Sequence, residues 1–353
     1  MSYLRSLKNF LGISFFLLLK LSSEHVEFVC QANGKVFSEI LGQNLVLGIS
    51  GRKITEGEIR LIKKFKPAGF VLYSRNIAEK HQLQELTQHL QSLSFEYSNL
   101  PAFIMVDEEP GGATRFGLLT HVIDGGKVNW SRIVTGLRLL KDVGINVLLA
   151  PIADWSYKCR DAWIGKRLPF VDLNSLCSFN KNFITVAAEM GLLTTAKHFP
   201  GLGCAKQDVH FAKIKIEIPE CEYFEMLKAF ECIVDLAPMI MTSHALYPKV
   251  DRNIATISQK IIQDQLRNFL KFKGIVITDD LMDMLETSSI IAKAEIAKQA
   301  IIAGANLLTF SHRLELFEKI FEYLLGEEKN VNFKTAVEKN YTLICKFKRE
   351  KLM

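Results

Sequence analysis

Short apolar runs alternate with amphipathic segments along most of the chain. From residue 44 onward, runs of four or five apolar residues are separated by stretches in which apolar residues recur every three or four positions. The first pattern predicts buried strands, and the second predicts helices that pack on them through one face. The predicted strands span residues 45–49, 69–73, 103–106, 146–150, 192–196, 239–242, 274–278 and 306–309. The predicted helices span residues 56–66, 81–93, 131–143, 176–190, 220–232, 258–270, 292–302 and 314–325.

The regular alternation of strand and helix predicts a parallel sheet. Eight such units are the number found in a single (β/α)8 TIM-type barrel, which is the fold we expect. A doubly wound open sheet is the alternative, but no early Gly-x-Gly-x-x-Gly supports a dinucleotide site. We expect one barrel domain over residues 44–326, an N-terminal extension over 1–43 and a basic C-terminal tail over 327–353. The Lys-rich run 346–351 predicts a solvated helix end.

The N-terminal extension is compatible with two locations of the protein. Arg5 and Lys8 precede an apolar run over residues 10–19, which is too short to span a bilayer and long enough for a signal-peptide core. Lys20 follows at once, and residues 21–23 are a poor cleavage site. We therefore expect a cytoplasmic protein without a stable membrane span, with export or membrane association through residues 1–23 as the alternative.

Composition and charge exclude several classes of protein. The hydrophobic content of 48% and charged content of 23% are typical of a soluble globular chain. The net charge of +6 is too diffuse to indicate a nucleic-acid partner. The seven cysteines are odd in number, and no two have C-x-x-C spacing. This pattern predicts neither a disulfide framework nor a zinc site, and it favours a reducing compartment.

Charged side chains and histidines collect where the predicted strands end. Catalytic groups of barrel enzymes come from the carboxyl ends of several strands, so these residues are the main evidence for an enzyme. Side chains alternate along a strand, so only one of Asp279 and Asp280 is expected to point into the mouth, while the other caps the following turn. The residues at the predicted strand ends are Asp107, Asp154, Lys197, His198, His244, Asp279, Asp280 and His312.

The segment from Lys197 to His210 carries the densest chemistry. Its strand is expected to end at Lys197-His198, because a Pro-Gly-x-Gly turn follows almost at once. Asp208 could orient His210 as a general acid/base, or the two could form an ordinary surface turn. Lys197 could act as a Schiff-base lysine or as a hydrogen-bonding partner. Without His-x-His or His-Glu-x-x-His in the sequence, we expect no catalytic metal and no cofactor.

Several segments in the same order resemble the family 3 glycoside hydrolases, and more narrowly the bacterial β-N-acetylglucosaminidases that trim cell-wall fragments. The match runs from about residue 44 to 325. The segments that carry it are Lys197–Gly203 with Asp208-x-His210, Gly69–Asn76, Val106–Glu109, Arg115–Phe116, Ala150–Asp154, Ile164–Arg167, Ser243–His244 and Gly274–Leu281.

The resemblance implies a retaining, two-step hydrolysis of terminal β-linked N-acetylglucosamine. It implies that Asp279 is the nucleophile and that His210, oriented by Asp208, is the acid/base. The residues implied to bind the sugar are Asp107, Arg115, Arg167, Lys197 and His198. We expect a monomer whose partner is a small carbohydrate or muropeptide substrate.

Departures from the family pattern keep two other functions open. Pro110, Leu202 and the pair Leu168-Pro169 stand where the family usually has other residues. A relative with another sugar specificity, such as a β-glucosidase or a phosphorylase, is one alternative. A catalytically silent barrel that only binds glycans is the other.

Overall fold

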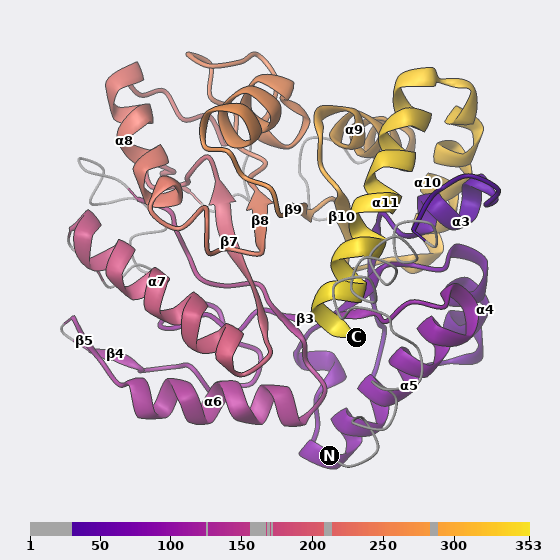
Figure 1. The fold of residues 1–353 in the computed structure, drawn as a ribbon, viewed down its shortest axis with the longest axis horizontal. Helices are drawn as coiled ribbons and strands as arrows, with labels where there is room; N and C mark the ends of the chain where they lie inside the picture. Colours follow the sequence, from indigo (N-terminus) through magenta and orange to yellow (C-terminus); the bar gives the residue numbers. More distant parts are fainter. Residues whose placement is uncertain are drawn as a thin grey trace, which may run out of the picture.

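Eight parallel strands close into a barrel in the computed structural model (Figure 1). It describes residues 30–155 except 125, residues 167 and 170, and the ranges 172–207, 214–282 and 289–353. The order around the barrel is β1-β10-β9-β8-β7-β6-β3-β2, so the first and last strands pair and close it. The strands are β1 (Leu45–Gly48), β2 (Gly69–Leu72), β3 (Phe103–Val106), β6 (Val147–Leu148), β7 (Leu193–Phe199), β8 (Met239–Thr242), β9 (Ile275–Asp280) and β10 (Leu307–Phe310). The predicted (β/α)8 TIM-type barrel is confirmed.

Helices surround the barrel at the positions that the apolar periodicity predicts (Figure 1). They are α4 (Glu56–Phe65), α5 (Lys80–Ser98), α6 (Trp130–Asp142), α7 (Leu173–Glu189), α8 (Glu220–Glu231), η4 (Lys260–Phe269), α9 (Ile290–Ala303) and α10 (Leu314–Gly326). The segment η4 is a π-helix, and the Ser258 hydroxyl accepts a hydrogen bond from Ile261 N at its start. Gly304 ends α9 in the left-handed region, with φ of 114°.

Several elements were not predicted. The strand β7 includes Lys197-His198, where it was expected to end, and extends one residue further to Phe199. A small antiparallel hairpin of β4 (Ile123–Asp124) and β5 (Lys127–Val128) precedes α6. Two further helices, α3 (Phe37–Gly42) and α11 (Val331–Leu352), flank the barrel sequence. Short 3-10 turns occupy Ser74–Asn76, Ala255–Ile257 and Glu327–Lys329.

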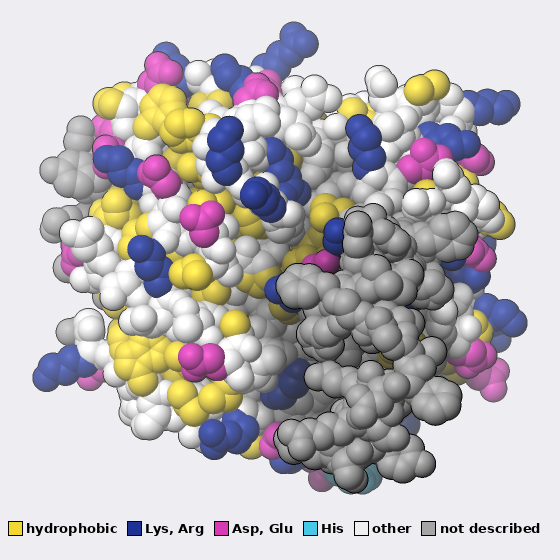
Figure 2. Space-filling model, in the orientation of Figure 1, with side chains coloured by type: hydrophobic (Ala, Val, Ile, Leu, Met, Phe, Trp, Pro, Cys, Tyr) yellow, Lys and Arg dark blue, Asp and Glu magenta, His cyan; other side chains and the backbone are white. Residues whose placement is uncertain are grey.

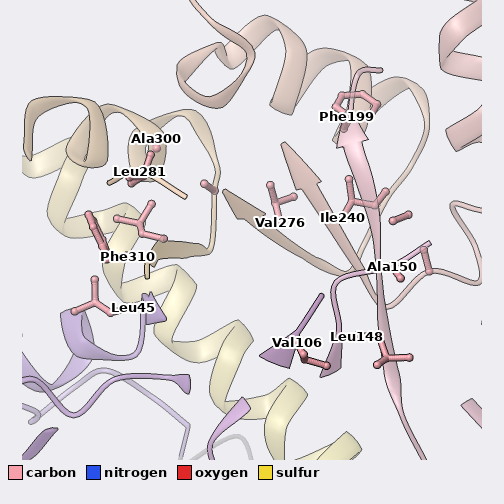
Figure 3. Close-up of a cluster of buried hydrophobic side chains, with 14 of the residues drawn as sticks. Leu45, Val106, Leu148, Ala150, Phe199, Ile240, Val276, Leu281, Ala300 and Phe310 are labelled. Carbon is pink, nitrogen blue, oxygen red and sulfur yellow. The ribbon is translucent and has the colours of Figure 1, made fainter. Parts of the chain in front are cut away.

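Alternate residues of the strands build two separate apolar layers. One set packs outward against the helices, and Figure 3 shows part of this layer around Val106, Ile240 and Val276. The other set points inward and fills the barrel, as Met105, Met241 and Ile277 do. Both faces of every strand are therefore buried, which explains why the strands are continuous apolar runs in the sequence.

The helix α11 closes the amino-terminal end of the barrel. Ile344 belongs to the inner apolar layer, and Phe347 packs against Phe103, the first residue of β3, with ring centroids 6.2 Å apart. Asn340 donates hydrogen bonds to the Asn44 side chain and to the Ala305 carbonyl, which lie just before β1 and β10. The chain beyond the predicted barrel thus contributes directly to the core.

Lys348 corrects the prediction that residues 346–351 form a solvated helix end. Its side chain is fully buried, donates a hydrogen bond to Gln43 Oε1 at 2.9 Å and lies 5.0 Å from the Phe103 ring centroid. Burial lowers its pKa well below the ordinary value of 10.5. No carboxylate in the described part of the chain forms an ion pair with it, so the protonated amine carries a desolvation cost.

Lys348→Met is expected to stabilise the protein by about 1 kcal/mol, because an apolar side chain of similar length replaces a buried amine. The folded state releases the Lys348 proton at a lower pH than the unfolded state, so wild-type stability rises between these two pKa values. The gain in Tm should therefore be largest below the folded-state pKa of Lys348 and shrink as the pH approaches 10.5. Thermal unfolding against pH measures this, with the exposed Lys351→Met as control. A variant less stable than wild type at pH 7 would refute it.

Disulfides overturn the prediction that the cysteines form no framework. Cys30 pairs with Cys345, and Cys177 pairs with Cys232; Cys204 is disulfide-bonded as well. Of the described cysteines, only the exposed Cys221 is free. The odd count misled the prediction because a single unpaired cysteine is enough to make the total odd. The pairs also join positions 315 and 55 residues apart, so no local spacing reveals them.

The described helices include none long and apolar enough to cross a membrane. On the face shown in Figure 2, Lys and Arg side chains are interspersed with Asp and Glu rather than gathered in one patch.

Candidate functional site

A cluster of alternating charges lies at the carboxyl end of the barrel strands. Lys197 Nζ, from β7, lies 2.7 Å from Asp107 Oδ1 and 2.7 Å from Glu109 Oε1. Arg115 Nη2 donates to Asp107 Oδ2 at 2.9 Å, and Arg167 Nε donates to Glu109 Oε2 at 3.1 Å. The structure thus brings together four of the predicted sugar-binding residues, with Glu109 as the additional member. We call these five residues the mouth cluster.

The charges of the mouth cluster stabilise one another in a buried place. Burial alone would raise the pKa of Asp107, but Lys197 and Arg115 outweigh it and hold that pKa well below its usual range. The pKa of Glu109 is lowered in the same way, because Lys197 and Arg167 outweigh its burial. Both carboxyl groups are therefore ionised at neutral pH.

Lys197 is a fixed cation in this cluster. Burial would lower its pKa, but Asp107 and Glu109 outweigh that effect, and the pKa is raised above its ordinary value. A Schiff-base lysine needs a depressed pKa so that the free amine can attack a carbonyl. The two carboxylates beside Lys197 therefore favour the role of a hydrogen-bonding partner over that of a Schiff-base lysine.

Glu108 holds the loop that carries Arg115. Its Oε2 accepts hydrogen bonds from the backbone N–H groups of Arg115 and Phe116, each at 2.9 Å. Its Oε1 accepts from Leu118 N at 2.7 Å and Leu119 N at 3.0 Å. A carboxylate that satisfies four backbone donors fixes the loop path, so Arg115 is aimed at Asp107 by the fold.

His198 belongs to a separate pair beside the mouth cluster. Its Nδ1 lies 2.7 Å from Asp154 Oδ2, and because a carboxylate only accepts, that nitrogen carries a proton. Asp154 Oδ1 accepts from His198 N and from Leu202 N. Burial would raise the pKa of Asp154, but His198 and these backbone donors lower it overall. The register of β7 shifts between Lys197 and Phe199, which lets two consecutive side chains reach different partners.

Asp279 and Asp280 have different environments at the end of β9. Asp280 accepts hydrogen bonds from Met282 N at 2.9 Å and Ser311 N at 3.3 Å, and also from the Ser311 hydroxyl. It therefore holds the following turn and the end of β10, as expected for one member of the pair. Asp279 Oδ1 accepts from Asp280 N at 2.9 Å.

The Tyr73 ring packs against two guanidinium groups at the mouth of the barrel. The guanidinium carbon of Arg115 lies 4.8 Å from its ring centroid, and that of Arg75 lies 4.7 Å from it. Burial raises the pKa of the Tyr73 phenol well above its ordinary value, and the carboxylates of Asp107 and Asp280 raise it further. The ring thus packs against the cation that binds Asp107.

Not every predicted site residue can be placed. Asp208 and His210 lie outside the described residues. Sequence reasoning missed Glu109 as a site residue, although it lies in one of the quoted family segments. The described residues contain no group of three His, Cys, Asp or Glu side chains arranged to hold a metal ion.

The closed parallel barrel and the charged residues at its strand ends define the class as a (β/α)8 barrel enzyme. The family model "Glycosyl hydrolase family 3 N terminal domain" matches residues 37–339, and the chain belongs to this family of glycosyl hydrolases.

Curated relatives agree with the family. A protein named "Beta-hexosaminidase" from Haemophilus ducreyi is 28% identical over 291 residues, covering 77% of this chain and 82% of the relative. A "Beta-hexosaminidase" from Idiomarina loihiensis is 29% identical over 256 residues, covering 67% of this chain and 74% of the relative.

Solved structures share the fold. A glycoside hydrolase family 3 beta-N-acetylglucosaminidase from Paenibacillus sp. has a TM-score of 0.79 at 24% identity, covering 90% of this chain and 63% of the other. The Beta-N-acetylhexosaminidase from Beutenbergia cavernae has a TM-score of 0.77 at 22% identity, covering 88% of this chain and 97% of the other.

Proposed function

We propose that this glycosyl hydrolase is a retaining β-N-acetylhexosaminidase that removes terminal β-linked N-acetylglucosamine, with peptidoglycan fragments as its substrates. The mouth cluster carries the proposal. Its fixed donors and acceptors alternate at one wall of the barrel mouth, as the hydroxyl groups of a pyranose require. The names of the curated relatives support the choice of sugar.

The proposed reaction uses Asp279 and His210. The Asp279 carboxylate attacks the anomeric carbon while protonated His210 gives its proton to the leaving oxygen, and a glycosyl-aspartate ester forms. His210 then takes a proton from water, the water oxygen attacks the anomeric carbon, and the ester bond to Asp279 breaks. Asp208 orients His210. The roles of Asp208 and His210 rest on the family resemblance alone.

The substrate is tested with paired nitrophenyl glycosides. We expect release of 4-nitrophenol from the N-acetyl-β-glucosaminide and much slower release from the β-glucoside. The rate should not depend on added phosphate, because water is the acceptor. Faster cleavage of the glucoside would favour a β-glucosidase, and a rate proportional to the phosphate concentration would favour a phosphorylase. Binding of N-acetylglucosamine without turnover by the folded protein would favour a silent glycan-binding barrel.

We also infer that the enzyme acts in an oxidising compartment. The pairs Cys30–Cys345 and Cys177–Cys232 support this, because such bonds persist outside reducing compartments. The inference favours the export alternative that the sequence left open and replaces the expectation of a cytoplasmic protein.

Thiol labelling checks this inference. When cells that make the protein are quenched with iodoacetamide, Cys221 should be alkylated, since it is exposed and free. The cysteines of the two pairs should react only after reduction and unfolding. Cys221 serves as the internal control for reagent access. Alkylation of the four paired cysteines in unfolded, unreduced protein would contradict the inference.

A further inference from the structure

A cavity lies at the end of the barrel opposite the mouth cluster. Its volume is about 600 Å³, and its walls come from η4, the end of α9 and α11. Asn306, directly before β10, lines the cavity together with Arg267, which donates to the carbonyl of Gly274 directly before β9. The amino ends of parallel strands lie at one end of a barrel, so this cavity is separate from the mouth.

The described lining is mixed, with polar side chains beside Ile301, Ile302, Ala336 and Leu343, and it contains no carboxylate. It contains Lys339, Thr335 and a set of side-chain amides as well as Arg267. The amides belong to Gln259, Gln263, Asn306, Asn332 and Asn340. Two cationic side chains without an acidic neighbour in the wall give the cavity a positive potential. Asn306 and Asn340 bond to each other and to neighbouring protein groups, so Gln259, Gln263 and Asn332 are the amides that offer hydrogen bonds to hydroxyl or carbonyl groups.

Arg267 is the side chain that most strongly indicates a ligand. Nη1 donates to the carbonyls of Phe272 and Gly274 at 3.1 and 2.7 Å, and Nη2 donates to Asn306 Oδ1 at 2.8 Å. A guanidinium has five N–H donors, so Nε–H and one Nη2–H remain without an acceptor among the described residues. All its partners there are neutral, and burial lowers its pKa to about 10.

We propose that this cavity binds a small oxyanion ligand, a carboxylate or phosphate that also carries hydroxyl groups. The anion pairs with Arg267 and Lys339, because a guanidinium and an ammonium are the side chains that recognise such groups. The amides of Gln259, Gln263 and Asn332 hold the hydroxyl groups. A cavity of this volume accommodates a molecule the size of a sugar acid or sugar phosphate. Since the ligand contacts both η4 and α11, it stabilises the position of α11, the helix that closes the barrel.

Calorimetric titration of the full-length protein tests the site with three probes that share a sugar skeleton. Gluconate supplies a carboxylate, glucose 6-phosphate supplies a phosphate, and glucose is the neutral control. Lys339→Glu is the key variant, because Lys339 is exposed and we expect its replacement to leave the fold intact. Lys351→Glu makes the same charge change on an exposed position of α11 outside the cavity. Arg267→Gln is a second variant whose folding is checked first.

We expect at least one anion to bind, glucose to bind at least tenfold more weakly, and affinity to fall at least tenfold in Lys339→Glu but not in Lys351→Glu. The anion that binds identifies the preferred group. The bound anion should also raise the Tm of wild type. Absence of binding by both anions, equal binding of glucose, or equal affinity in wild type and Lys339→Glu would overturn the proposal. None of these results depends on glycosidase activity.

Discussion

Asp279→Ala is expected to reduce turnover of the N-acetyl-β-glucosaminide by roughly 10⁴- to 10⁶-fold, the loss usual for a covalent nucleophile. The side chain lies at the end of β9, and its neighbour Asp280 already holds Met282 and Ser311. Loss of the Asp279 carboxylate removes the group that forms the glycosyl ester, while the turn keeps its anchor. Steady-state kinetics and the Tm of the variant measure the two effects separately.

A small nucleophile should restore part of the lost activity. Azide can enter the space that the Asp279 side chain leaves and attack the anomeric carbon, provided that a good leaving group makes acid assistance unnecessary. The product would be the glycosyl azide of inverted configuration. Asp264→Ala, at an exposed position of η4, is the matched control and should keep wild-type turnover. Wild-type turnover in a folded Asp279→Ala protein would exclude Asp279 as the nucleophile.

Lys197→Met is expected to destabilise the protein by about 3–5 kcal/mol, because it leaves two buried carboxylates without their shared cation. Asp107 and Glu109 each lie 2.7 Å from Nζ of Lys197. For a chain of 353 residues, a loss of this size corresponds to a fall in Tm of roughly 4–7 °C. The variant should also lose binding of the sugar, since the orientation of Asp107 depends on Lys197 and Arg115.

The pH dependence separates this effect from a simple packing defect. Asp107 and Glu109 have lowered pKa values in the folded state, so their stabilising contribution exists above their ordinary values of 3.8 and 4.5 and is lost as the pH falls. The difference in Tm between wild type and Lys197→Met should therefore shrink below pH 4. A difference that is constant with pH would refute the ion-pair explanation.

An exposed ion pair provides the matched control. Lys228 Nζ lies 2.6 Å from Glu225 Oε1, nearly the same distance as in the mouth cluster, but both side chains are exposed. Lys228→Met should cost less than about 1 kcal/mol, because water screens the pair. Equal losses in the two variants would mean that burial is not what makes Lys197 important.

The sequence predicts the barrel well because its strands have both faces buried. Each strand is a continuous apolar run, and each surrounding helix has one apolar face, so both patterns are visible locally. The helix α11 escaped prediction because its buried positions lie among many lysines, and one lysine, Lys348, is itself buried.

The sequence predicts those site residues that stand at or near the carboxyl end of an apolar strand run. Asp107 follows β3 directly, and Asp280 ends β9 and binds the next turn as the alternation of side chains suggests. Lys197 lies near the end of β7, two residues before its last residue Phe199. Glu109 was missed because its partner Arg167 is 58 residues away, and nothing local distinguishes it from a surface acid. The disulfides were missed for the same reason, since pairing between distant cysteines is a property of the folded chain.

The position of α11 fixes the order in which this protein can be completed during synthesis. The inner apolar layer gains Ile344 only after all eight barrel strands have been made, and Cys345 joins Cys30 at the same point. A nascent chain whose residues from 331 onward are still in the ribosomal tunnel therefore carries a barrel that is open at one end. A chain truncated before residue 331 would leave the amino-terminal end of the barrel exposed to chaperones and proteases.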